Sequence, residues 1–140
     1  YDAPSHESSW KNHLLAELKH QIPIEKLLFT GLLDYNDYRE LLWRTNLHCY
    51  FTKPYVTSWS LFEAAACGAR LAVNKNQATE GIVEAKTANW VSLDNQFILS
   101  QQLEVLLAKP GIQSKLSPEF DLQTSLKQWE QLLNRALQKS

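Results

Sequence analysis

Methionine is absent from this chain of 140 residues, and cysteine, glycine and proline are scarce, with two, four and five copies. A chain that starts at Tyr1 and contains no methionine is expected to be a piece of a longer protein. Cys49 and Cys67 are too few and too separated for a disulfide framework, and both fall in apolar segments, so we expect reduced core thiols and a cytoplasmic location. No internal repeat and no low-complexity tract is present.

Long apolar runs and strong net charge are also lacking. No run approaches the roughly 20 residues that a membrane-spanning helix needs, and no signal-peptide pattern is found. A net charge of −1 gives no electrostatic reason to expect binding to nucleic acid or to an anionic membrane. The four histidines show no metal-ligand spacing, and there is no P-loop, GxGxxG, GxSxG or CxxC motif. We therefore expect neither a metal nor a bound cofactor.

Strand and helix patterns alternate along most of the chain. We predict strands over residues 26–30, 47–52, 70–73 and 90–93, and helices over 10–20, 35–44, 96–107 and 122–138, with one further helix that stops at Gly68. Asp94 is predicted to cap the helix over 96–107, and we expect one helical turn at 80–84 and a turn at 113–116. Such alternation predicts an α/β fold, with a Rossmann-like parallel sheet and helices on both faces, in a single domain over residues 1–140.

The segment 47–68 is the centre of the sequence. Leu47, Cys49 and Phe51 alternate with more polar residues, so we expect these three side chains to face the core of a strand. Pro54 ends the strand because it cannot donate a ladder hydrogen bond.

A helix follows this strand after a short loop. Either Ser58 or Ser60 can cap it, Ser60 and Glu63 match the capping-box pattern, and Gly68 ends it. A strand, a short loop and a capped helix make the unit in which α/β proteins offer free backbone N–H groups to a phosphate.

Residues 62–68 (FEAAACG), preceded by 58–61 (SWSL), resemble the donor-binding signature of the family 4 glycosyltransferases with the GT-B fold. One branch of that family carries Ser-Trp-Ser-Leu before the glutamate, and similar residues recur at Trp10, 29–31 and 38–42. The resemblance implies that this chain is the C-terminal, nucleotide-sugar donor-binding domain. It also implies that an N-terminal acceptor-binding domain and the first donor-domain strand belong to the same protein but precede this piece. A sheet without its first strand allows the fragment to dimerise.

By the same resemblance, the whole enzyme transfers a sugar from a nucleotide diphosphate sugar to an acceptor hydroxyl, with retention of configuration and without a metal in the protein site. Polysaccharide biosynthesis is a common setting for such families. Glu63 would accept hydrogen bonds from two ribose hydroxyls; the alternative is a capping-box glutamate that bonds the backbone near Ser60. The implied nucleotide-sugar site consists of Lys53, Tyr55, Val56, Thr57, Ser58, Ser60 and Glu63. No residue is assigned a catalytic role.

Two positions depart from the family pattern. Tyr55 stands where many family 4 enzymes have a glutamate that contacts the donor sugar, and the second donor contact, often a glutamate, falls at either Glu80 or Gly81. These departures favour the alternative of a non-catalytic, glycosyltransferase-like module for binding or assembly. An unrelated phosphoreceiver domain is disfavoured because the strand ends lack clustered acidic residues.

Overall fold

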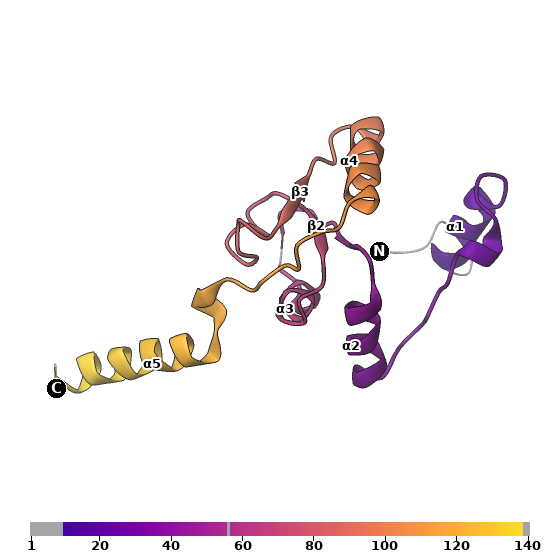
Figure 1. Cartoon of the computed structure of the whole chain (residues 1–140). Helices are drawn as coiled ribbons and strands as arrows, with labels where there is room; N and C mark the ends of the chain where they lie inside the picture. Colours follow the sequence, from indigo (N-terminus) through magenta and orange to yellow (C-terminus); the bar gives the residue numbers. More distant parts are fainter. Residues whose placement is uncertain (1–9, 56, 139–140) are drawn as a thin grey trace. The chain divides into compact units, whose positions relative to one another are not determined.

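A computed structural model describes residues 10–55 and 57–138 of the chain. The chain divides into two compact units: the first ends at Asp34 and the second begins at Tyr35 (Figure 1). The organisation as a single donor-binding domain stays a prediction.

The first unit contains helix α1, Trp10–Leu18, and one turn of 3-10 helix, η1, Ile24–Lys26. The helix predicted over residues 10–20 is confirmed, although none of the described side chains of α1 is buried. Two aromatic contacts occur in this unit. The Trp10 ring meets His13 of the same helix edge-on at 5.4 Å between centroids, and the Lys11 ammonium lies 5.2 Å from the Phe29 ring centroid, which links α1 to the segment after η1.

The strand predicted over residues 26–30 is wrong. Lys26 ends η1, no strand forms over the next four residues, and the Leu28 side chain is 85% exposed. A run of three apolar residues becomes a strand only when a neighbouring strand pairs with its backbone. The described part of the first unit contains no other strand that could do so.

A parallel three-stranded sheet forms the centre of the second unit. Its strands β1 (His48–Tyr50), β2 (Leu71–Asn74) and β3 (Asn89–Val91) lie in the order β1-β2-β3. Helix α3, Trp59–Ala66, connects β1 to β2, as a parallel crossover requires (Figure 1). The predicted α/β class and the parallel sheet are confirmed.

Two helices cover one face of this sheet. Helix α2, Tyr35–Arg44, buries Leu42, and α3 buries Leu61 and Ala64. These side chains form one apolar cluster with Leu71 and Val73 of β2. The 3.6-residue period of the helices and the two-residue period of the strand therefore meet in the same core.

The predicted core face of β1 is reversed. His48 pairs with Leu71 and Tyr50 with Val73, so the Tyr50 ring packs against the core, and Cys49 is exposed instead of buried. The larger ring of Tyr50 brings more apolar area to the core than Cys49 could. The other thiol, Cys67, is partly buried against the same core, and both cysteines are free.

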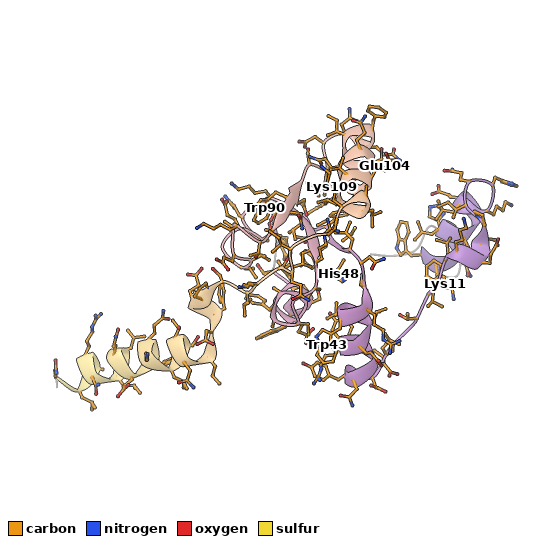
Figure 2. The ribbon with its side chains drawn as sticks, viewed as in Figure 1. Lys11, Trp43, His48, Trp90, Glu104 and Lys109 are labelled. Atoms are coloured by element: carbon orange, nitrogen blue, oxygen red, sulfur yellow. The ribbon has the colours of Figure 1, made fainter. Side chains whose placement is uncertain are left out.

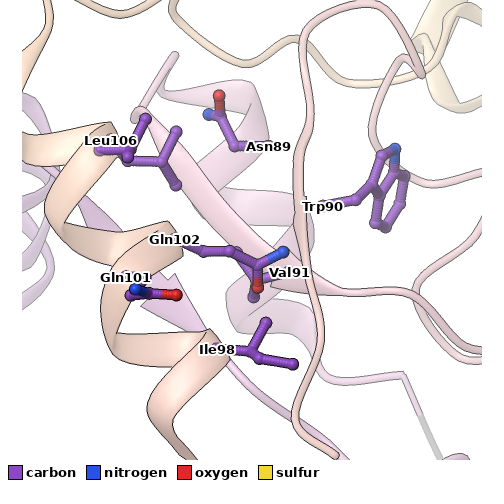
Figure 3. A pocket seen from close by; sticks show the side chains of 8 residues that line it. Asn89, Trp90, Val91, Ile98, Gln101, Gln102 and Leu106 are labelled. Atoms are coloured by element: carbon purple, nitrogen blue, oxygen red, sulfur yellow. The ribbon is translucent and has the colours of Figure 1, made fainter. Parts of the chain in front are cut away.

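The opposite face of the sheet is next to helix α4, Gln96–Ala108. Val91 faces Ile98 and Gln102 across a cavity of about 410 Å³, while the neighbouring Trp90 ring points away from α4 (Figure 3). Gln102 also accepts a hydrogen bond of 3.0 Å from the Ser92 N–H.

Asn95, and not Asp94 as predicted, caps α4. The Asn95 side chain accepts hydrogen bonds from the N–H groups of Phe97 (2.8 Å) and Ile98 (3.2 Å). The Asp94 carboxylate accepts instead from the Ser92 hydroxyl at 2.8 Å. Adjacent Asp and Asn residues are equally good N-caps, so propensity cannot choose between them.

The chain after α4 crosses the second unit in an extended form, so the turn predicted at 113–116 is wrong. Leu116 makes an antiparallel bridge with Val83, and the Glu84 N–H donates to the Lys115 carbonyl at 2.8 Å, so residues 80–84 end in this bridge and not in a helical turn. A 3-10 turn η2, Pro118–Phe120, and helix α5, Leu122–Leu137, follow.

His48 makes the stability of the second unit dependent on pH. His48, labelled in Figure 2, lies in β1. Burial lowers the pKa of its imidazole below the ordinary value of 6.5. Below about pH 6.5 the imidazole is protonated in the unfolded chain but stays neutral in the folded chain until the pH is lower. We therefore expect the free energy of unfolding to be highest above pH 6.5 and to fall as the pH drops below it. Urea unfolding midpoints measured across this range test the expectation. The slope should flatten in His48→Gln and persist in the His20→Gln control; an unchanged slope in His48→Gln would contradict it.

Candidate functional site

The carboxyl end of β1 carries two of the predicted site residues. Lys53 and Tyr55 lie in the segment between β1 and α3, and both side chains are exposed, Tyr55 by 92%. The Tyr55 N–H donates to the Lys53 carbonyl at 2.8 Å, which makes a tight turn around Pro54. Val56 lies outside the described residues.

Two hydroxyls lie together at the start of α3. Ser58 is the N-cap, and its side chain accepts a hydrogen bond from the Ser60 N–H at 3.3 Å. The two serine hydroxyls are 2.9 Å apart. The choice between Ser58 and Ser60 as cap is thereby decided for Ser58. Both predicted phosphate contacts therefore lie where the partial positive charge of the helix end is concentrated.

Glu63 lies in the second turn of α3 and is half-buried. With Ser58 as the cap, Glu63 falls two positions beyond N3, so the capping-box interpretation of Ser60 and Glu63 is wrong. The carboxylate interacts instead with the Tyr38 hydroxyl of α2. Burial, and then the charge of Glu63 and its hydrogen bond with the phenol, raise the pKa of Tyr38.

One phenol leaves most of the carboxylate's capacity unused, because a carboxylate has about four acceptor positions and a single O–H donor occupies one. The role of Glu63 as a ribose acceptor stays a prediction.

The segment after β1 is hydrogen-bonded to the end of β2 and to the loop that follows it. The buried Asn74 side chain accepts a hydrogen bond from the Thr52 N–H (2.9 Å) and donates one to the Thr52 carbonyl (2.8 Å). Asn76 donates a second bond to the same carbonyl at 2.9 Å. Asn74 is not among the site residues predicted from the sequence, where its only signal is its position directly after the buried run Leu71–Val73.

A second fastening lies near α3. Thr57, one of the predicted site residues, donates through its hydroxyl to the Ala78 carbonyl at 2.6 Å, so this hydroxyl serves the loop in the structure. Thr79 is fully buried, and its hydroxyl donates to the Asn74 carbonyl at 2.7 Å and accepts from the Asn76 N–H at 3.1 Å. The polar loop 74–79 is thus built largely on its own internal hydrogen bonds.

The two candidate positions for the second donor contact differ. The Glu80 carboxylate pairs with the Lys75 ammonium at 3.0 Å, with both side chains more than half exposed. Gly81 has a φ of +87°, a backbone conformation that residues other than glycine rarely adopt. A cavity of about 370 Å³ lies beside this loop, lined by Asn74, Lys75 and the segment 90–94.

No group of three metal-ligating side chains occurs among the described residues. Within the same ranges, no helix has the length and apolar character needed to cross a membrane. Comparisons of the chain with protein-family models, with curated proteins and with solved structures found no match.

Proposed function

We propose that this chain is the donor-binding domain of a GT-B glycosyltransferase similar to family 4, and that it binds a nucleotide diphosphate sugar. The observation that carries the proposal is the β1–α3–β2 unit. It is a parallel strand–helix–strand unit in which the hydroxyls of Ser58 and Ser60 stand at the start of α3, with Glu63 one turn further on. Ligands of open parallel sheets bind at this edge, outside the carboxyl ends of the strands.

The diphosphate would lie at the start of α3. A helix N-terminus stabilises an anion by typically 0.3–1 kcal/mol, and by about 2 kcal/mol when partly buried. The exposed Lys53 ammonium, on the preceding segment, adds a positive charge within the same edge of the sheet. These groups bind the leaving nucleoside diphosphate more strongly as its negative charge grows, and stabilisation of this kind accelerates the transfer itself.

The ribose would bind Glu63, whose remaining acceptor positions suit two hydroxyl donors. The acceptor, and the groups that act on it, would come from the N-terminal domain of the same enzyme. The sugar transfer with retention, the assembly of the complete Rossmann-like half and the cytoplasmic location are parts of this proposal.

The second candidate function is a non-catalytic module that binds nucleotide without transferring sugar. Two observations favour it. An exposed Tyr55 stands at the position where many family 4 enzymes have a glutamate that contacts the sugar, and the Glu80 carboxylate already forms an ion pair with Lys75. Both functions predict nucleotide binding, and only the first predicts turnover of a donor by the protein that contains both halves.

Titration of the chain with UDP, GDP and ADP, followed by amide chemical shifts, tests the binding. We expect one nucleotide to shift the amides of Lys53, Thr57 and Ser58. We expect Glu63→Gln to weaken its affinity by about one to two orders of magnitude, because hydrogen bonds to a charged acceptor contribute about 1.5–3 kcal/mol each and those to a neutral acceptor about 0.5–1.5 kcal/mol. The matched control is Glu104→Gln, an exposed glutamate of α4, which should bind as the wild type does.

Three results would contradict the proposal in whole or in part. Equal affinity in wild type and Glu63→Gln would remove the ribose assignment and leave the phosphate contacts standing. Shifts confined to the segment 90–94 would move the site to the neighbouring cavity. An absence of shifts at millimolar nucleotide would count against the proposal.

A further inference from the structure

The Asn74 side chain extends the hydrogen-bond ladder beyond the point where β1 and β2 separate. β1 ends at Tyr50, and Thr52 lies two residues later, beyond the last backbone pairing of the two strands. There the Asn74 carboxamide bonds both polar groups of Thr52, at 2.9 Å to the N–H and 2.8 Å to the carbonyl. Asn74 is buried, with 8% of its surface exposed, and both bonds are partly buried, so water competes for them less than it would at the surface.

A carboxamide meets both requirements of this position at any pH. The N–H of Thr52 needs an acceptor and its carbonyl needs a donor, and asparagine offers one of each on adjacent atoms. A carboxylate at this position could accept from the N–H, but it would repel the carbonyl oxygen.

The backbone carbonyl of Asn74 is itself hydrogen-bonded within the loop that follows β2. Thr79 donates to the Asn74 carbonyl at 2.7 Å, and Thr57 reaches across to the Ala78 carbonyl at 2.6 Å. The segment between Thr52 and Thr57 is therefore fixed at its two ends to one loop, and Lys53 and Tyr55 project from it into solvent.

We infer that Asn74 is a positioning residue: it fixes the backbone of Thr52 and thereby helps to present Lys53 and the start of α3 to an anionic ligand. The identity of that ligand, a nucleoside diphosphate, rests on the proposed function; the fixing of the segment does not. In this role the Asn74 side chain bonds the backbone of Thr52 and does not itself contact the ligand.

The substitution Asn74→Asp tests the inference because it can be reversed by pH. At about pH 8 the carboxylate cannot donate to the Thr52 carbonyl, which keeps only the bond from Asn76 at 2.9 Å, and its charge repels the carbonyl oxygen. At about pH 4.5 a buried aspartate is partly protonated, and the neutral acid again offers one donor and one acceptor. Asn89→Asp is the matched control: Asn89 also donates from a strand to a backbone carbonyl, that of Leu71 at 2.7 Å, but it lies at the amino end of β3.

The first readout is the amide-exchange protection of Thr52, divided by that of Val73 in the same sample to remove global effects. We expect Asn74→Asp to lower this ratio about tenfold at about pH 8, with substantial recovery at about pH 4.5 relative to wild type at that pH, because the lost bonds belong to a local opening. Asn89→Asp should leave the ratio within about twofold, since its bond lies on a different segment.

The second readout is the affinity for whichever of UDP, GDP and ADP binds the wild type most tightly. It should fall about tenfold in Asn74→Asp and recover with the Thr52 protection, as expected for a lost preorganisation of the site. An unchanged Thr52 ratio, or an equal loss in Asn89→Asp, would overturn the inference. Lost protection with unchanged affinity would also overturn it, because the segment would then be fixed without serving the site. If the wild type binds none of the three nucleotides, the proposed function fails, and the pH-reversible Thr52 ratio alone decides whether Asn74 fixes the segment.

Discussion

Leu61→Ala should lower the free energy of unfolding by about 2–5 kcal/mol, which is the usual cost of truncating a leucine in a packed core. Leu61 is fully buried on α3, at the centre of the cluster that joins this helix to Leu42 of α2 and to Leu71 and Val73 of β2. Removing three carbon atoms there loses their transfer free energy and leaves a cavity between two helices and a strand, which cannot close around it.

Chemical denaturation followed by circular dichroism measures this loss. The control is Leu132→Ala on α5, where the side chain is 56% exposed, and we expect a change within about 0.5 kcal/mol. If both variants lost the same stability, the packing of α3 against the sheet would not be the main source of stability in the second unit.

Thr79→Val should cost about 2–4 kcal/mol, although valine matches threonine in shape. The fully buried hydroxyl donates to the Asn74 carbonyl and accepts from the Asn76 N–H, and each buried backbone group that loses its partner costs about 1–3 kcal/mol. Because the same loop carries the Asn74 carboxamide, the amides of Thr52 and Thr57 should also shift in this variant.

The matched control is Thr45→Val. Its hydroxyl likewise donates to a backbone carbonyl, that of Leu41 at 2.6 Å, but this bond is exposed, so water can replace it and we expect a loss of about 0.5 kcal/mol or less. Denaturation midpoints of the two valine variants give the comparison. A smaller loss in Thr79→Val than in Thr45→Val would mean that water reaches the loop 74–79.

The elements that local chemistry determines could be predicted from the sequence. The α2 bounds, 35–44, are as predicted, and α5 ends one residue earlier than predicted. Helix periodicity, capping residues and Gly68 after α3 all act within one or two turns of the chain, so a single sequence contains the information.

The features that depend on distant partners could not be predicted in this way. The apolar run at Leu27–Phe29 has the composition of a strand, but it forms none because no neighbouring strand among the described residues pairs with its backbone. Which face of β1 is buried depends on its register with β2, and a shift by one residue exchanges Cys49 for Tyr50.

The same reason hides the fastening of the candidate site. Thr52 and Asn74 are 22 residues apart in the sequence, and nothing local to either predicts that one side chain will bond the other's peptide. Glu63 could be selected from its motif, whereas its neighbour Tyr38 could not, because the packing of α2 against α3 brings them together.

The uncovered apolar side of α5 has a consequence for how this chain behaves at high concentration. Leu122, Leu126, Trp129 and Leu133 recur at helical spacing and are each at least half exposed, and none of the described residues of α5 is buried. The net charge is only −1 and the isoelectric point lies near 6.5. Copies of the chain therefore expose an apolar face on α5 and repel one another very little near neutral pH. We expect the chain to self-associate most readily at that pH, which is also the usual pH of a nucleotide titration.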